Sequence, residues 1–264
     1  MIQHKKIGLA ITSCKRLHFL RRVLKAFNIF CNDQDLIDSI IFFDDSSSEE
    51  DKKEMERILN ELFPMQEKII THLYQDSFQD TYRHSRILNL LREKLKENQI
   101  DYFFILEDDY LFVDFFSISE TVELLEKFPE YGYAGFAQGF KKFPPHIQPK
   151  QIGDYWEWFY DPNQPLNCNL FLDESSAVQA LIPDLWMTYI NWPSFSLRPG
   201  THNVSRFLDV GEFSTDYDRN TMRTELEFAI RWSKKYKSLC HKRFHIVNLG
   251  FDSSTSAYTL NNCE

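Results

Sequence analysis

Strand-like and helix-like patterns alternate through the first 115 residues, and this alternation constrains the fold more than any other feature of the chain. The apolar runs that we interpret as strands lie at 7–12, 39–43, 69–74 and 102–106. Between them, apolar residues recur at helical spacing, for example Leu17, Leu20 and Leu24 after the first run. Strands that alternate with helices favour a parallel sheet with right-handed crossovers. The sequence therefore predicts an α/β fold with a mostly parallel central sheet flanked by helices.

Polar residues follow each of these four runs. They are Thr12-Ser13, Asp44-Asp45-Ser46, Gln75-Asp76 and Glu107-Asp108-Asp109. The carboxyl ends of parallel strands meet at one edge of a sheet, and ligands of such sheets bind there. We therefore expect hydroxyls and carboxylates from four strands to line one crevice, which is stronger evidence for a site than any single motif.

The acidic triplet is the central feature of this crevice. Side chains alternate along a strand, so Glu107 and Asp109 should share one face while Asp108 takes the other, unless the chain turns there. Converging carboxylate oxygens suit a Mg²⁺ or Mn²⁺ ion that bridges a diphosphate. A solvated acidic turn that merely ends the strand is an equally good interpretation of the triplet taken alone.

The second strand end has two readings as well. Asp44 and Asp45 with the following serines can bind a uracil edge or ribose hydroxyls through hydrogen bonds. Ser46 to Ser48, followed by Glu49, Glu50 and Asp51, also form a good start signal for a helix. We expect the serines to cap the helix and the acids to face the ligand.

Composition argues against several classes of partner. A net charge of −9 disfavours nucleic acid or an anionic membrane as the main partner, because both require a cationic surface. The five cysteines are odd in number and lack metal-ligand spacing, which favours a reducing compartment. No apolar run has the length of a secretion signal or a membrane span. We therefore expect a cytoplasmic protein without a transmembrane segment, and peripheral contact with a membrane stays open.

Several segments, in this order, resemble the GT-A glycosyltransferases, which are nucleotide-diphospho-sugar transferases, and particularly the family-2-like enzymes. Residues 7–16 look like the first strand and its nucleotide-binding turn, and Phe43 to Ser47 like the second acidic segment. Glu107-Asp108-Asp109 is similar to the DXD metal site, although Glu stands at its first position. Residues 229–232 and 247–255 are similar to a C-terminal signature of some bacterial members.

The resemblance implies a nucleotide-sugar donor, with UDP favoured by family frequency, and Mn²⁺ or Mg²⁺ as cofactor. Asp109 would be the principal metal ligand, with Asp252 as an addition, and Asp45 would contact the nucleoside. The remaining donor-binding candidates are Thr12, Ser13, Arg16, Asp44, Glu107 and Asp108, with Glu107 or Asp108 acting through water or the ribose. Arg83 or Arg86 can steady the diphosphate, or can simply be exposed arginines on a helix.

Glu225 is the candidate general base of an inverting transfer. It begins a predicted helix at 221–236, where related enzymes carry a helix-borne acid, and a carboxylate must take the proton of the attacking acceptor hydroxyl. The alternative is an acid that only stabilises the helix dipole. Asp218 and Asp216 in the preceding loop are competing candidates. His245, inside a predicted strand at 244–248, is read as a structural residue.

We expect a single domain over residues 1–264, in which 1–115 bind the nucleotide-sugar and 116–264 form a smaller acceptor-side region that also supplies the base. Aromatic residues, among them Trp156, Trp158, Trp186 and Trp192, suit sugar faces or ordinary packing. The acceptor can be a glycan, a lipid-linked molecule or a protein. Three alternatives remain: a sugar nucleotidyltransferase, disfavoured by the lack of glycine after the first strand, a two-metal phosphohydrolase, and a non-catalytic scaffold.

Overall fold

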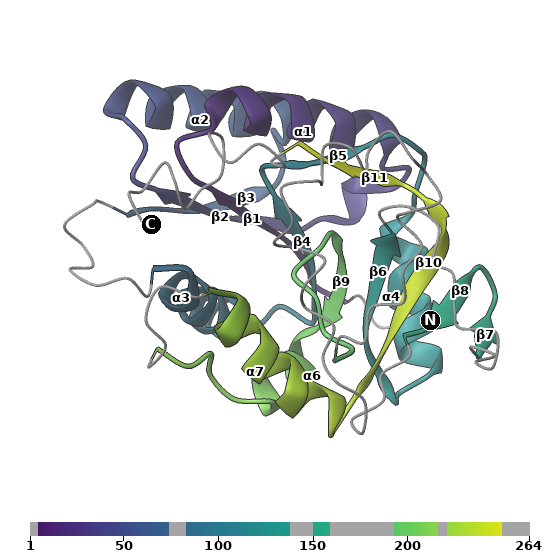
Figure 1. Cartoon of the computed structure of the whole chain (residues 1–264). Helices are drawn as coiled ribbons and strands as arrows, with labels where there is room; N and C mark the ends of the chain where they lie inside the picture. Colours follow the sequence, from purple (N-terminus) through teal and green to yellow (C-terminus); the bar gives the residue numbers. More distant parts are fainter. Residues whose placement is uncertain (1–4, 74–82, 138–149, 159–192, 216–220, 250–264) are drawn as a thin grey trace, which may run out of the picture.

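The structure is a computed structural model, and it describes residues 5–73, 83–137, 150–158, 193–215 and 221–249. Helices lie on both faces of one large twisted sheet (Figure 1). Nine strands form this sheet in the order β3-β2-β1-β4-β9-β6-β10-β8-β7. Beside it, β5 (Tyr110–Phe112) and β11 (Ile246–Asn248) pair as a small antiparallel sheet.

The four strands predicted from the first half of the sequence are neighbours in the sheet. They are β1 (Ile7–Ser13), β2 (Ser39–Asp45), β3 (Glu67–Leu73) and β4 (Tyr102–Glu107), and every contact between them is parallel. The predicted alternation of strand and helix is confirmed, because α1 (Leu17–Phe30), α2 (Glu49–Leu62) and α3 (Arg83–Glu97) connect them. The carboxyl ends of β1, β2 and β4 consequently lie side by side at one edge of the sheet.

The second half of the chain completes the sheet with strands that the sequence did not suggest. β9 (Gly200–Asn203) runs antiparallel between β4 and β6 (Tyr131–Ala137), and β10 (Lys237–Phe244) lies parallel to β6. β8 (Tyr155–Glu157) and β7 (Gln151–Ile152) add a short antiparallel edge. Of the nine strands only β8 and β9 oppose the others, so the prediction of a mostly parallel sheet is confirmed.

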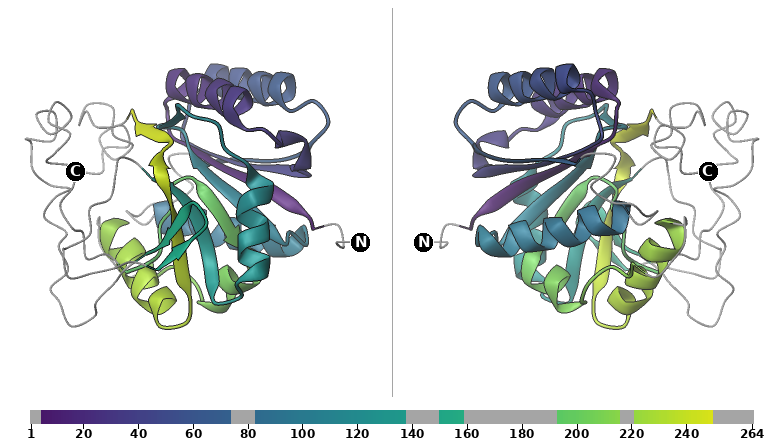
Figure 2. Two further views of the ribbon diagram at one scale, coloured as in Figure 1. Left: turned by 90° about the vertical axis from the view of Figure 1, so that its right-hand side faces the viewer. Right: turned by 90° about the vertical axis from the view of Figure 1, so that its left-hand side faces the viewer.

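Each face of the sheet has its own hydrophobic core. One core is closed by α1, α2 and α4 (Ile118–Lys127), and it contains the stacked rings of Phe112 and Phe116, whose centroids are 4.0 Å apart. The other is closed by α3, α6 (Val204–Asp209) and α7 (Thr221–Ser233), with Trp232 fully buried. Figure 2 shows these two helical layers on either side of the sheet.

Two glycines explain why the sequence gives no clear strand signal for β6. Its sequence, Tyr-Gly-Tyr-Ala-Gly-Phe-Ala, lacks the β-branched residues that usually mark strands. A Cβ on Gly132 would lie 2.5 Å from the Trp232 indole, and one on Gly135 would overlap the ring of Tyr133. Glycine is therefore required by the tight packing of aromatic rings on this strand, although it reads as a loop signal in the sequence.

Candidate functional site

The ends of β1, β2 and β4 bring the predicted polar residues together. Ser13 is in register with Asp44, and Thr12 with Glu107. Both turns that leave β1 and β2 contain a residue in the left-handed region, Lys15 with φ 52° and Ser46 with φ 65°. Residues other than glycine adopt this conformation infrequently, and such positions cluster at functional sites. The Lys15 amide donates to Ser47 Oγ at 3.1 Å, which ties the two turns together.

Arg16 is buried beneath the acidic triplet and forms ion pairs with two of its members. Its Nε donates to Asp108 Oδ2 at 3.2 Å and its Nη2 to Asp108 Oδ1. Its Nη1 donates to Asp109 Oδ2 at 3.1 Å. Strand β4 ends at Glu107 and the chain turns at the next two residues. The expected alternation, with Asp108 on the face opposite Glu107 and Asp109, applied only if the chain did not turn there. Because the chain does turn, one arginine reaches both aspartates.

Asp108 is fully buried in the site. Ser13 Oγ donates to its Oδ2 at 2.8 Å, and the Cys14 amide donates to the same oxygen at 3.2 Å. Burial raises the pKa of Asp108 to about 6, although the Arg16 charge opposes this shift. Burial, with the charges of Asp45 and Asp108, also raises the pKa of the Cys14 thiol to about 12, so this thiol is not a nucleophile at neutral pH.

Asp109 keeps one carboxylate oxygen without a partner. Its Oδ1 is buried and has no hydrogen bond to the described residues. Its backbone carbonyl accepts a hydrogen bond of 2.7 Å from the amide of Leu249, directly after β11. Burial raises the pKa of Asp109, and Arg16 opposes this shift. Leu249 thus holds the backbone of the acidic turn, while Arg16 holds its side chains.

Glu107 and Glu225 lie close enough for their charges to interact. The pKa of Glu107 is raised well above its ordinary value, first by burial and then by the negative charges of Asp109 and Glu225. Burial also raises the pKa of Glu225, while the Leu197 amide, 3.4 Å from Oε1, and the charge of Arg198 oppose the shift. Glu225 on α7 therefore lies near Glu107 at the end of β4.

The end of β2 holds a second acidic group. Asp44 is fully buried, and the Nδ1 of His72 lies 3.3 Å from its Oδ2, while His72 Nε2 lies 2.9 Å from Glu56 Oε1. Ser46 Oγ donates to Asp45 Oδ1 at 3.1 Å. Ser48 caps α2, since its Oγ accepts from the Asp51 amide at 3.1 Å. The predicted helix cap is confirmed for Ser48, and both acids are integral to β2.

Some of the other predicted residues are described by the structure, and others are not. Thr12 is half-buried in β1 and Arg86 is half-buried on α3. Arg83 begins α3, but its side chain lies outside the description. Asp216, Asp218, Asp252, Gln75-Asp76, Trp186 and Trp192 all lie outside the described residues. His245 is buried between β10 and β11 and not inside a strand, with Nδ1 3.0 Å from the Arg243 carbonyl, which fits its predicted structural role.

Arg198 is a member of the site that no sequence signal indicated. It precedes β9, and its positive charge acts on Glu225, Tyr110 and Tyr133. Tyr133 Oη donates to the Arg198 carbonyl at 3.0 Å. The segment around it carries no motif, so only the folding of β9 against β4 brings this cation to the acids.

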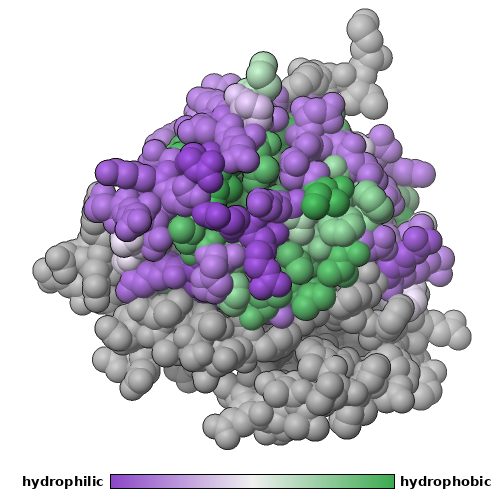
Figure 3. Space-filling view, turned by 90° about the horizontal axis from the view of Figure 1, so that it is seen from above, coloured by the Kyte–Doolittle hydropathy of each residue, from purple (hydrophilic) through white to green (hydrophobic). Residues whose placement is uncertain are grey.

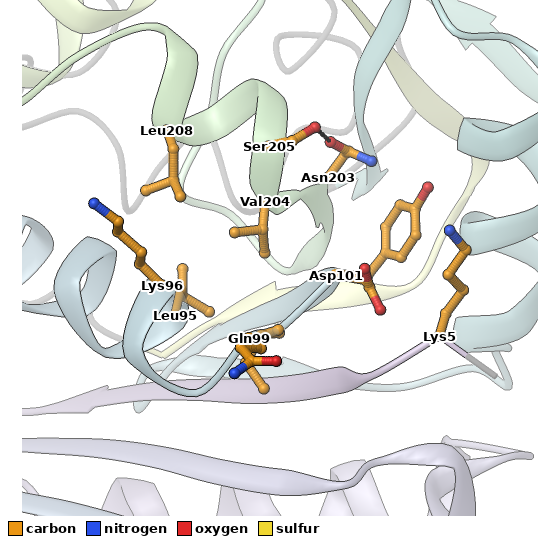
Figure 4. Close-up of a pocket in the computed structure, with 11 residues that line it drawn as sticks. Lys5, Leu95, Lys96, Gln99, Asp101, Asn203, Val204, Ser205 and Leu208 are labelled. Carbon is orange, nitrogen blue, oxygen red and sulfur yellow. Dashed lines mark hydrogen bonds between the residues drawn. The ribbon is translucent and has the colours of Figure 1, made fainter. Parts of the chain in front are cut away.

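The cavity drawn in Figure 4 is separate from this cluster. It measures about 340 Å³ and is lined by apolar side chains such as Leu95, Val204 and Leu208, with Lys5 and Lys96 at opposite sides. It lies where β1 and β4 begin, at the opposite end of these strands from the acidic turn. It therefore does not belong to the candidate site.

The outer face of α1 and α2 is largely hydrophilic, with one apolar patch (Figure 3). Exposed apolar residues near the end of α1 and after β5 include Ile29, 63% exposed, and Phe115, 58% exposed. Within the described ranges no helix is long and apolar enough to cross a membrane. In the same ranges no group of three or more His, Cys, Asp or Glu side chains has the geometry to hold a metal ion by itself.

Comparison with known proteins identifies the fold. No family model and no curated protein matches the sequence. The mannosyltransferase PcManGT from Pyrobaculum calidifontis, solved in complex with GDP-Man and Mn2+, has a TM-score of 0.59 at 11% identity, covering 99% of this chain and 61% of that chain. S. aureus TarS 1-349 has a TM-score of 0.55 at 6% identity, covering 93% of this chain and 60% of that chain.

This chain spans less than two thirds of the length of each of these proteins. At such low identities a structural likeness is evidence of a shared fold and not of a shared substrate. The chain has an α/β fold with a large, mostly parallel central sheet flanked by helices, and it shares this fold with the mannosyltransferase PcManGT.

Proposed function

We propose that the chain is a metal-dependent glycosyltransferase of the GT-A type, which transfers a sugar from a nucleotide-diphosphate donor to an acceptor hydroxyl. The observation that carries this proposal is the approach of Glu225, on α7, to Glu107, which ends β4 and lies beside Asp109. A carboxylate base beside a pair of acids is what metal-assisted transfer to a hydroxyl requires. The fold shared with PcManGT supports the same reading.

The acidic turn fits a divalent cation. Asp109 Oδ1 is a buried carboxylate oxygen without a hydrogen bond to the described residues, and the pKa of Glu107 beside it is raised, first by burial and then by the charges of Asp109 and Glu225. Mg²⁺ and Mn²⁺ sites often use one or two carboxylates, with the remaining ligands from phosphates and water. Asp109, with Glu107, would hold the cation, which when bound neutralises charge on the donor diphosphate as the nucleotide departs.

Glu225 acts on the acceptor. An unprotonated carboxylate here accepts the proton of the acceptor hydroxyl while that oxygen attacks the anomeric carbon. The Leu197 amide and the Arg198 charge favour the ionised form of Glu225, whereas burial opposes it. Attack from the side opposite the nucleotide inverts the anomeric centre, and a single base on α7 is consistent with this outcome. Asp218 remains a competing candidate for the same role.

Donor recognition is assigned to the ends of β1 and β2 and to the start of α3. Asp45 with Asp44 would contact the nucleoside, and Thr12 and Ser13 would line the same turn. Arg83 and Arg86, at the start of α3, are candidates for the diphosphate. Asp252 stays a candidate for a second contact to the metal. We favour UDP by family frequency, and GDP is the principal alternative because PcManGT was solved with GDP-Man.

Binding measurements test the proposal. UDP-, GDP- and CMP-sugars are titrated calorimetrically, with and without Mn²⁺ or Mg²⁺, into the wild type and into Asp109→Asn. We expect one nucleotide class to bind with metal and to raise the unfolding temperature, because a ligand at 100 times its Kd stabilises the folded state by about 2.7 kcal/mol. Asp109→Asn should lose the metal-dependent part.

Asp35→Asn is the matched control, because this exposed acid on the short helix η1 (Gln34–Leu36) can be neutralised without touching the site. It should bind like the wild type. If the folded wild type binds no member of the panel, the transferase proposal is wrong, and a non-catalytic scaffold becomes the better account of the fold.

A further inference from the structure

Arg16 uses all three guanidinium nitrogens on the acidic turn. Nε and Nη2 donate to Asp108, and Nη1 donates to Asp109 Oδ2 at 3.1 Å. The arginine side chain is only 8% exposed. A planar guanidinium offers donors in a fixed fork, so one side chain can hold two carboxylates in a defined relative orientation.

Both oxygens of the Asp108 carboxylate accept hydrogen bonds from protein donors. Oδ2 accepts from Ser13 Oγ, the Cys14 amide and Arg16 Nε, and Oδ1 accepts from Arg16 Nη2. The side chain is 0% exposed. A carboxylate that accepts from four protein donors and has no exposed surface is poorly placed to bind a cation from solvent.

Asp109 is held differently from its neighbour. Arg16 engages only Oδ2, and Leu249 fixes the backbone carbonyl at 2.7 Å. Oδ1 has no hydrogen bond to the described residues, and the side chain is 16% exposed. Arg16 thus leaves Asp109 Oδ1 available to a ligand and restricts the orientation of the Asp109 carboxylate.

We propose that Arg16 is a positioning residue that withdraws Asp108 from the metal site and presents Asp109 Oδ1 as a single, oriented metal ligand. Of the acidic triplet, Glu107 and Asp109 would then bind the metal, while Asp108 is the buried counter-ion of Arg16. This inference rests on the proposed metal-dependent function. It assigns Arg16 to the orientation of a ligand, a role distinct from the direct contact with the donor that its place after β1 suggested.

The test is direct measurement of Mn²⁺ binding. Free Mn²⁺ is followed by its electron paramagnetic resonance signal during titration, in the presence of the nucleotide that the binding panel selects. We expect Arg16→Lys to weaken Mn²⁺ binding by about 10- to 100-fold, the usual loss when a residue that orients a metal ligand is changed. Lysine keeps the positive charge that Asp108 needs but cannot hold both aspartates with a fork.

Two further variants sharpen the test. Arg21→Lys makes the same replacement at a largely exposed arginine of α1 that pairs with Glu54, so its Mn²⁺ affinity should equal that of the wild type. Asp108→Asn keeps an oxygen to which Arg16 Nη2 can donate and removes no proposed metal ligand, so it should weaken Mn²⁺ binding clearly less than Asp109→Asn does. Circular dichroism establishes that each variant is folded.

The outcomes separate the two proposals. Wild-type affinity in folded Arg16→Lys, or a loss of Mn²⁺ binding in folded Asp108→Asn as large as that in Asp109→Asn, overturns the positioning role and leaves the transferase proposal standing. If Arg16→Lys does not fold, the Asp108→Asn result decides alone. Failure of the wild type itself to bind Mn²⁺ with any nucleotide sinks the metal-dependent function and the positioning role together.

Discussion

Arg16 and Asp108 form an ion pair whose side chains are 8% and 0% exposed, at the junction of two strands that are 92 residues apart in the sequence. Transferring two charges from water to such a place is costly, and only good geometry with additional hydrogen bonds compensates. Ser13 and the Cys14 amide supply those bonds. The pair therefore couples the integrity of the first turn to that of the acidic turn.

Arg16→Met should be strongly destabilising, by about 3–5 kcal/mol, because it leaves Asp108 buried without its counter-ion. The double variant Arg16→Met/Asp108→Leu buries no charge and should recover most of this loss. Urea unfolding at pH 7.5 measures both. Equal losses in the single and the double variant would show that packing, and not the orphaned charge, is responsible.

Much of the fold of residues 1–115 was predictable, because strand and helix periods alternate and acids follow the strands. The burial of Asp108 against Arg16 was not predictable, since a run of three acids does not reveal which of them pairs with a buried arginine. Arg16 was predicted as a donor contact from its place after β1, and the sequence contains no sign of its partner in the turn after β4. Pairs of this kind depend on which strands become neighbours.

The elements after residue 115 were harder to predict from the sequence, for a different reason. The helix predicted at 221–236 is observed as α7, Thr221–Ser233, because its apolar residues keep a helical period. Strands β6 and β9 contain glycines at close contacts and give no clear strand signal in the sequence. A Cβ on Gly200 would lie 2.5 Å from the Gly135 Cα, so glycine is the consequence of close strand contact there. That contact is visible only after folding.

Gly132→Ala tests this account of β6. The added Cβ would lie 2.5 Å from the Trp232 indole, which is fully buried and cannot move freely, so we expect a loss of about 1–3 kcal/mol in unfolding free energy. Gly8→Ala in β1 is the matched control, because its nearest contact would be an ordinary 3.4 Å to Ile100. Chemical unfolding of both variants gives the comparison, and a Gly132→Ala protein as stable as Gly8→Ala would refute it.

His202 makes stability depend on pH. It is fully buried on β9, stacked on Phe103 with centroids 4.8 Å apart, and neither ring nitrogen forms a hydrogen bond of normal geometry to the described residues. Burial lowers its pKa to about 3, from an ordinary value of 6.5. The folded state therefore favours the neutral ring, whereas the unfolded chain binds a proton below pH 6.5.

His202→Phe should consequently gain stability relative to the wild type as the pH falls. The wild-type contribution is complete above pH 6.5 and declines by about 1.4 kcal/mol per pH unit between 6.5 and 3, so the difference between the proteins should change by about 2 kcal/mol from pH 7.5 to 5. Urea unfolding at the two pH values measures it. His18→Phe, at an exposed position of α1, is the matched control, and a change as large as that of His202→Phe would refute the assignment to His202.

Glu225→Gln should separate catalysis from donor binding. Removal of a general base costs about 10²- to 10⁴-fold in rate, whereas nucleotide affinity should be unchanged because the donor is assigned to the ends of β1, β2 and β4. Release of nucleotide from the donor, with water as acceptor, measures the rate without knowledge of the natural acceptor. Glu227→Gln, on the same helix and paired with Arg231, is the control and should retain the wild-type rate.

The pH profile adds an independent check on Glu225. Because burial raises its pKa above the ordinary value of 4.5, the base is lost by protonation at a higher pH than an exposed glutamate would be. The rate should rise with pH through this raised pKa and then level off, and the rising limb should vanish in Glu225→Gln. A residual rate in Glu225→Gln that keeps the rising limb would assign the base to another carboxylate, with Asp218 the first to be replaced.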